Sequence, residues 1–264
     1  MKRYITFVLI VMVVMTTVHA RASSVGSPET QGQGKVATAV EWDYIFDRDL
    51  DFIKAARPSG HENDRPLNFR IDKGYNLAGK ISYGLFKTMD IYIKLGIANY
   101  SLKGDVFIGD TKKVEEKLLA RNAFLYGGGF KLAYELKDGW IVGCDAQYLT
   151  SDHELDFSAT SIPSGTVTTA KYYDCWIQEW HAAPYIAKRI SDFALYAGGR
   201  YSDLRLSQKN PSDPRRWDNL IFDADYNIGV FTGIDWKFRD SFKLNVEGRF
   251  VDETAMSVVA TYIF

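Results

Sequence analysis

Apolar and polar residues alternate with a period of two along most of this chain. Between residues 75 and 85 every second residue is apolar or small, and Lys80 lies in the opposite set. The stretches 91–100, 123–136 and 242–251 repeat this pattern, with their Lys, Glu and Arg residues on one face. Because successive side chains of a strand point to opposite faces, the pattern predicts strands with one apolar and one charged face.

Ten such strands are predicted. Their approximate cores are 36–46, 75–85, 91–100, 123–136, 140–150, 172–187, 193–203, 223–238, 242–251 and 255–264. An even number places both ends of the set on the same side, as in bacterial single-chain barrels. Eight or twelve strands remain the alternatives.

Strand length and the spacing of the connections separate two architectures. A β-sandwich would bury the apolar face, whereas a membrane barrel turns it to lipid and the charged face to the lumen. The predicted strands are near the roughly 9–11 residues of a tilted membrane strand. The connections alternate between long and short: the long ones are 47–74, 101–122, 151–170 and 204–221, and the short ones are 87–90, 137–139, 188–192 and 239–241. Short turns at one rim and long loops at the other are typical of outer-membrane barrels.

The positions of the aromatic residues also favour a membrane barrel over a sandwich. They make up 14% of the chain and recur near predicted strand ends, for example at Phe46, Trp140 and Phe250. Amphipathic rings collect at the two membrane interfaces of a barrel. We therefore predict an all-β fold, a transmembrane antiparallel up-and-down β-barrel.

The first 22 residues predict a secretory signal peptide. Lys2 and Arg3 precede an apolar run that is too short to span a membrane as a helix, and small residues follow. Two cleavage frames predict a mature amino terminus at Arg21 or Ser23. The predicted organisation is a signal peptide at 1–22, a flexible periplasmic leader at 23–34 and the barrel domain at 35–264.

The last strand resembles the assembly signal at the carboxyl end of bacterial outer-membrane proteins. Val258, Ala260, Tyr262 and Phe264 fall on one face of an alternating stretch that ends in Phe. The resemblance implies insertion by the barrel-assembly machinery and location in the cell outer membrane. In size the chain is similar to the small OmpX-like and omptin-size barrels, with no specific family assigned.

The composition gives no reason to expect a nucleic-acid partner, a metal or a cofactor. The net charge of −1 gives no reason to expect a nucleic-acid partner, and the two cysteines have no metal-cluster spacing, so neither a cofactor nor a metal is expected. Parity places Cys144 towards lipid and Cys175 towards the lumen, which disfavours a disulfide. The residues predicted to face the lumen are Glu41, Asp43, Lys80, Lys94, Lys131, Glu135, Asp145, Glu179, His181, Arg200, Asp225, Asp235, Lys243, Glu247 and Arg249.

A narrow lumen with charges of both signs predicts a network of ion pairs, because unpaired charges are costly there. We expect a structural or surface-interaction protein without enzyme activity, with a small selective channel as the alternative. An omptin-like protease is the less favoured alternative. Its candidate groups are Asp152, His153, Asp223 and Asp225, but Asp152 and His153 are adjacent, so they point to opposite faces of a strand.

The long connections are the remaining candidates for function. Residues 109–122 are charged and predict a helical turn, and residues 210–219 contain Arg215, Arg216 and Trp217. Arginines beside an aromatic ring suit lipopolysaccharide phosphates or sugars. The expected partners are therefore outer-membrane lipids and lipopolysaccharide, together with the assembly machinery, and the sequence names no extracellular ligand.

Overall fold

The computed structural model describes residues 24–55, 64–108, 111–162, 164–209 and 220–264. The predicted signal peptide and the Arg215–Trp217 segment lie outside these residues. Apart from a 3-10 turn, η2 (Lys137–Gly139), the elements are strands: β1 Val36–Ala55, β2 Asp64–Phe86, β3 Met89–Ile108, β4 Thr111–Glu135, β5 Trp140–Ser161, β6 Val167–Ile190, β7 Phe193–Lys209, β8 Leu220–Ala224, β9 Ile228–Arg239, β10 Phe242–Phe250 and β11 Thr254–Ile263.

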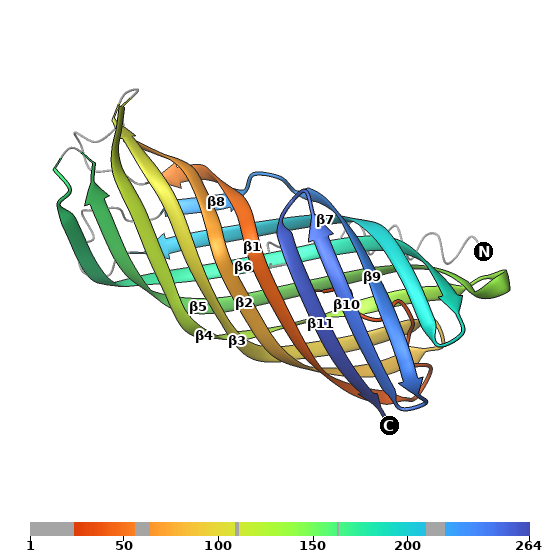
Figure 1. Ribbon diagram of the computed structural model, residues 1–264. Coiled ribbons are helices and arrows are strands. Elements are labelled where there is room, and N and C mark those ends of the chain that lie inside the picture. Colours follow the sequence, from red (N-terminus) through yellow and green to blue (C-terminus); the bar gives the residue numbers. More distant parts are fainter. Residues whose placement is uncertain (1–23, 56–63, 109–110, 163, 210–219) are drawn as a thin grey trace.

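Ten of these strands form one closed antiparallel barrel (Figure 1). The order around the wall is β1-β2-β3-β4-β5-β6-β7-β9-β10-β11, and β11 pairs with β1 to close it. The closing register places Val40 opposite Ala260 and Trp42 opposite Val258. The predicted ten-stranded barrel is therefore confirmed.

Most of the predicted long loops are wrong, because the strands on that side continue well beyond the predicted ends. β1 runs to Ala55 instead of residue 46, and β4 begins at Thr111, where a helical turn was expected. Inward apolar residues such as Leu118 and Ala120 alternate in β4 with outward Lys117 and Leu119. A strand outside the membrane carries polar residues on its outer face, so its sequence looks like a solvated loop.

The predicted strand 223–238 is also wrong, because it is divided by a bend at 225–227. β8 precedes the bend and pairs with β1 at Leu50↔Ala224 and with β7 at Arg205↔Asp223. β9, β10 and β11 are only 12, 9 and 10 residues long and stop before that level. The wall thus has ten strands at the end of the barrel where the carboxyl terminus lies. At the opposite end it has eight, β1 to β8.

The outward face of the ten-stranded part is apolar. Val40, Ile81, Ile93 and Leu195 are each at least half exposed although they lie in mid-strand. The short strands β9 to β11 match the length that crosses a hydrocarbon core. Apolar side chains outside and charged side chains inside exclude the sandwich and define a lipid-facing belt. The longer part of β1 to β7, with β8, then projects beyond the membrane.

Among the described residues, no helix is long and apolar enough to cross a membrane.

Cys144 and Cys175 are not joined to each other by a disulfide. Cys175 is fully buried inside the barrel, whereas Cys144 is only partly buried.

Candidate functional site: the filled lumen

The interior of the barrel is filled by three sets of residues. The first is the amino-terminal plug, residues 24–31, which enters from the end where the short turns lie. The second is the charge network, the buried ionic side chains of the wall. The third is the apolar cluster, which fills the eight-stranded outer part and includes Leu50, Phe69, Leu102, Leu155 and Phe222.

The structure places thirteen of the fifteen predicted lumenal residues in the charge network. All are buried: Glu41, Asp43, Lys80, Lys94, Lys131, Asp145, Glu179, His181, Arg200, Asp235, Lys243, Glu247 and Arg249. The other two lie outside the lumen. Glu135 ends β4 at the rim, where it is exposed and pairs with Arg189 at 2.7 Å. Asp225 lies exposed in the bend after β8.

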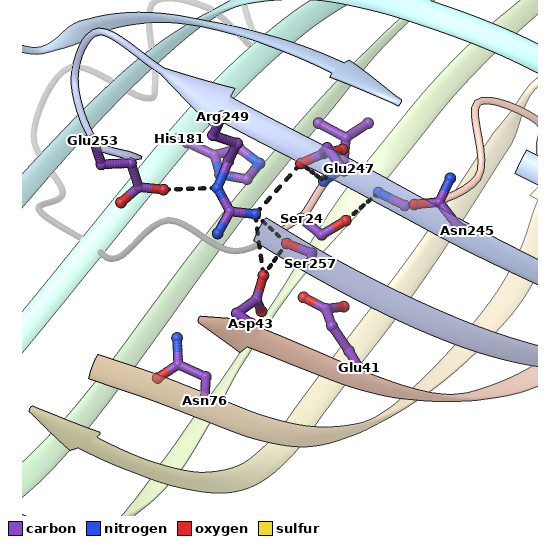
Figure 2. A network of polar contacts seen from close by, with 12 residues as sticks. Ser24, Glu41, Asp43, Asn76, His181, Asn245, Glu247, Arg249, Glu253 and Ser257 are labelled. Atoms are coloured by element: carbon purple, nitrogen blue, oxygen red, sulfur yellow. Dashed lines mark hydrogen bonds and ion pairs between the residues drawn. The ribbon is translucent and has the colours of Figure 1, made fainter. Parts of the chain in front are cut away.

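The ion pairs of the network connect different strands of the wall. Lys94 Nζ on β3 lies 2.8 Å from Glu41 Oε1 on β1. In addition, His181 on β6 and Asp145 on the neighbouring β5 form a hydrogen bond, with 3.2 Å between Nε2 and Oδ1. Figure 2 shows Arg249 at the centre of a group of acceptors from several strands. These bonds supply the polar partners that buried charges need.

Four members of the network were missed by sequence reasoning: Arg48, Asp90, Asp252 and Glu253. Asp252 and Glu253 belong to the turn between β10 and β11, where Val251 has φ 84°, and both carboxylates are buried. Arg200 Nη2 lies 2.6 Å from Asp252 Oδ2, and Arg48 Nη1 lies 3.2 Å from Glu253 Oε2. Arg48 fell in a predicted loop, and nothing in the short "VDET" stretch indicates that its acids point inward. The sequence offered one indication that Arg48 points inward: it lies two residues before the apolar Leu50, and residues two apart share a face of a strand.

The amino-terminal plug is held largely through its backbone. The Val25 N–H donates to Glu247 Oε2 at 3.2 Å, and Lys131 Nζ donates to the carbonyl oxygens of Val25 and Ser27. The Gln31 N–H donates to Asp90 at 2.9 Å. The segment predicted as a flexible leader therefore lies partly inside the barrel, with its inner backbone groups bonded to wall side chains.

Glu29 anchors the plug at the rim. Its carboxylate lies 2.7 Å from Lys243 Nζ and also pairs with Arg189. Although burial opposes ionisation, these two cations hold the pKa of Glu29 below its ordinary value. The charged form of Glu29 is thus favoured in the folded protein, and it fastens the plug to β6 and β10.

The apolar cluster closes the outer half of the interior. The rings of Phe69 on β2 and Phe222 on β8 stack with centroids 4.2 Å apart, and Phe52 packs edge-on against Phe222. β8 therefore contributes a core residue as well as closing the eight-stranded ring.

The three sets together fill the described part of the lumen almost completely, and a cavity between the plug, Lys80 and Lys131 measures only about 20 Å³. Arg48, Lys94, Asp145, Leu149 and His181, at different levels of the barrel, are each at most 1% exposed. A water-filled channel would expose the side chains that line it. The described part of the barrel is therefore a filled cylinder, as expected near eight strands.

A cavity of about 850 Å³ lies at the outer end, walled by β1 to β5 and by Asp225. Its carboxylates are Asp49, Asp51, Asp105, Glu115, Glu116 and Asp225, and its cations are Arg70, Lys103 and Lys117. Burial raises the pKa of Glu116 to about 7. Slight burial and the neighbouring Asp51 carboxylate raise the pKa of Asp225. The cavity is thus an acidic surface feature, separated from the lumen by the apolar cluster.

The protease candidates do not assemble into a site. His153 is buried, where Nδ1 lies 2.8 Å from the Arg121 carbonyl oxygen and Nε2 contacts Ser151. Asp152 points to the opposite, exposed face of β5. Asp223 pairs with Arg205 at 2.9 Å on β7. The Asp and His groups thus have no common water position from which general-base chemistry would start.

No group of three or more His, Cys, Asp or Glu side chains in the described part of the chain is placed to hold a metal ion.

The residues of the predicted assembly signal lie on the outward face of β11. Tyr262 and Phe264 are 44% and 71% exposed at the short-turn rim, and Val258 and Ala260 are partly exposed above them. The Phe264 N–H donates to the Val36 carbonyl oxygen at 2.9 Å, so the chain end stays paired with β1.

Comparisons with known proteins support the fold. The sequence matches no protein-family model and no curated protein. The outer membrane protease OmpT of Escherichia coli is similar in structure, with a TM-score of 0.50 and 12% identity over 92% of this chain and 99% of that one. The β-domain of the Bordetella autotransporter BrkA has a TM-score of 0.49 at 9% identity over 88% and 99% of the two chains. The translocator domain of the autotransporter NalP from Neisseria meningitidis has 0.45 at 9% identity over 88% of each.

The chain has the fold of a bacterial outer-membrane β-barrel. Identities this low show the fold alone. The lipid-facing belt agrees with it, and together they place the protein in the outer membrane.

Proposed function

We propose that the protein is a non-conducting outer-membrane barrel with a structural or surface-interaction role. The observation that carries this proposal is the filled lumen, in which charged residues at several levels are at most 1% exposed. An ion would have to displace both the charge network and the apolar cluster to pass. Displacing one partner of a buried ion pair costs about 3–5 kcal/mol, so thermal opening would be rare.

The outer extension is the part suited to interaction. β8 and its partners hold an eight-stranded wall with its own apolar cluster beyond the membrane. A filled barrel is a rigid support on which exposed connections and the acidic cavity can meet a partner. The proposed partners in the membrane itself are outer-membrane lipids and lipopolysaccharide along the apolar belt, and insertion would use the barrel-assembly machinery.

Absence of enzyme activity is part of this proposal. Its support is that His153 is buried with Ser151 and the Arg121 carbonyl oxygen, away from the exposed Asp152. A general base must reach the proton that it removes, directly or through one water. A buried imidazole facing the apolar cluster does not meet this condition.

The test is conductance of the refolded protein in a planar bilayer. We expect no channel events above the bare-membrane baseline, with insertion checked in the same preparation by resistance of the folded barrel to SDS. Discrete, ion-selective openings would contradict the proposal and favour the selective channel.

A further inference from the structure

The amino-terminal plug lies in the lumen in the manner of a bound peptide. Its residues belong to no strand, and it joins β1 through a turn in which Gly32 and Gly34 have φ of 90° and 79°. Glycine adopts such a conformation without strain, so the chain can reverse direction sharply at this point. The plug is therefore a segment tethered at one end, and the side chains that hold it form a site on the wall.

The wall binds the backbone of the plug from several sides. Lys131 Nζ alone donates to two carbonyl oxygens, those of Val25 and Ser27. Peptide groups are common to every sequence, so bonds of this kind recognise an extended backbone and supply affinity, while side-chain pockets supply specificity. The wall residues that bond to plug peptide groups come from β3, β4, β6 and β10, and they are Asp90, Lys131, Tyr185 and Glu247.

Two side chains of the plug are recognised individually. Val25 is 1% exposed and lies in a small apolar cluster whose aromatic members are Tyr185, Tyr196 and Phe231. Four residues later, Glu29 Oε2 lies 2.7 Å from Lys243 Nζ, and Glu29 Oε1 accepts from Arg189 Nε at 2.6 Å. In an extended chain these two positions are about 13 Å apart. The site thus selects an apolar side chain and, four residues towards the carboxyl end, an acidic one.

The site is open to one side of the membrane only. The apolar cluster, with Leu50 and Phe222, fills the opposite half of the barrel interior. A segment therefore enters or leaves the site at the short-turn rim, which faces the periplasm in barrels of this kind. A ligand that takes the place of the plug must come from the periplasm, and its binding opens no path across the membrane.

We propose that the short-turn end of the lumen is a binding site for an extended periplasmic peptide that carries an apolar residue four positions before an acidic one. The plug of this chain occupies the site as a tethered ligand, and a peptide of the same pattern displaces it. A segment on a short linker competes at an effective concentration on the order of millimolar, so displacement needs a high local concentration of the partner. The inference goes beyond the proposed structural role and does not depend on whether the barrel conducts.

The first test measures binding of a free peptide to a chain with a weakened plug. The probe is the peptide SVGSPETQG, residues 24–32, labelled with a fluorophore at its carboxyl end. The protein is the whole chain with Val25→Ser and Glu29→Gln, refolded in detergent micelles, and the readout is fluorescence anisotropy. We expect saturable binding, and binding at least about tenfold weaker to the wild-type chain, whose intact plug competes better. Absence of saturable binding to the substituted chain would overturn the proposal.

Matched peptides separate recognition of the pattern from non-specific adsorption. Probes with Val25→Ser or with Glu29→Gln should each bind the substituted chain at least about tenfold more weakly than the original probe. The first loses its buried apolar contact, and the second loses its charge-assisted bonds to Lys243 and Arg189. Equal binding of all three peptides would contradict the proposed site.

If the substituted chain does not fold, the wild type decides the question. An excess of unlabelled SVGSPETQG should displace the plug of the wild-type chain and so speed hydrogen exchange at the amides of Val25 and Gln31, which donate to Glu247 and Asp90. Exchange at these two amides that stays unchanged in several millimolar peptide would contradict the proposal.

Discussion

Arg249 Nη1 on β10 lies 3.0 Å from Asp43 Oδ1 on β1, although β11 separates these two strands in the wall. Ser257 on β11 bridges them, since it contacts both side chains. The strand pair that closes the barrel, β1 with β11, is thus fastened from the inside by a three-strand polar contact. Arg249 also pairs with Glu253 at 2.7 Å, which fixes the β10–β11 turn to the same point.

Replacing Arg249 with Met should strongly destabilise the barrel. The substitution leaves the buried carboxylates of Asp43 and Glu253 without this partner, and breaking a buried pair in this way costs about 3–5 kcal/mol. The matched control is Arg121→Met, because Arg121 is about half exposed and pairs with Asp156 on the outer face. An exposed pair contributes about 1 kcal/mol or less. Urea unfolding in lipid vesicles measures both, and equal losses would refute the role given to the buried network.

Depth along β11 should determine the cost of an outward charge. Val258 lies at the middle of the strand and Thr254 at its outer end, and both face outward. We expect Val258→Arg to destabilise the folded protein by about 2–4 kcal/mol and Thr254→Arg by about 1 kcal/mol or less. Equilibrium folding into vesicles, followed by tryptophan fluorescence, gives the two values. A similar cost at both positions would place the membrane elsewhere on the barrel.

Glu116 should make the stability of the outer extension depend on pH. Burial raises the folded-state pKa of this carboxyl to about 7 from its ordinary value of 4.5. Its stabilising contribution is therefore fully present below about pH 4.5 and is lost as the pH rises through about 7. Compared with Glu116→Gln, the wild type should lose on the order of 2 kcal/mol between pH 5 and pH 8. Urea midpoints of both proteins at the two pH values test this, and parallel profiles would show that Glu116 is not desolvated.

Phe222 should be essential for the eight-stranded outer ring. Its ring stacks on Phe69 and is almost completely buried, so Phe222→Ala should destabilise the extension by about 3–5 kcal/mol. Ile53→Ala, on the exposed outer face of β1, is the control and should change stability by about 0.5 kcal/mol or less. Limited proteolysis of vesicle-bound protein reports the outcome. If cleavage near β8 is no faster in Phe222→Ala than in the control, the apolar cluster does not support the extension.

The sequence predicts the membrane part of this barrel better than the outer part, for a physical reason. Between Tyr75 and Leu85 the lipid-facing set must be apolar and the lumenal set polar, so the period of two is visible. In β4 beyond the membrane, Lys117 faces water and Leu118 faces the apolar cluster. That arrangement inverts the pattern, and a short segment of it is indistinguishable from a helical turn or a loop.

The residues that fill the lumen are also only partly predictable from the sequence. Parity alone predicts that Glu41, Lys94 and Arg249 point inward, because their strands are regular. It does not predict the inward acids of the β10–β11 turn, since a turn has no fixed side-chain period. Nor does it predict the plug, because Val25 and Gln31 are held through their backbone N–H groups, which every non-proline residue carries.

The native Cys175 reports directly on whether the lumen is filled. Its thiol is fully buried in the apolar cluster, so a charged, membrane-impermeant thiol reagent should not reach it from either side. In a Cys144→Ser chain folded into vesicles, we expect Cys175 to remain unmodified, by intact mass, for as long as an exposed Thr168→Cys control without other cysteines takes to react completely. Modification of Cys175 at a rate close to that of the control would show that water and ions enter the barrel, and would contradict the account.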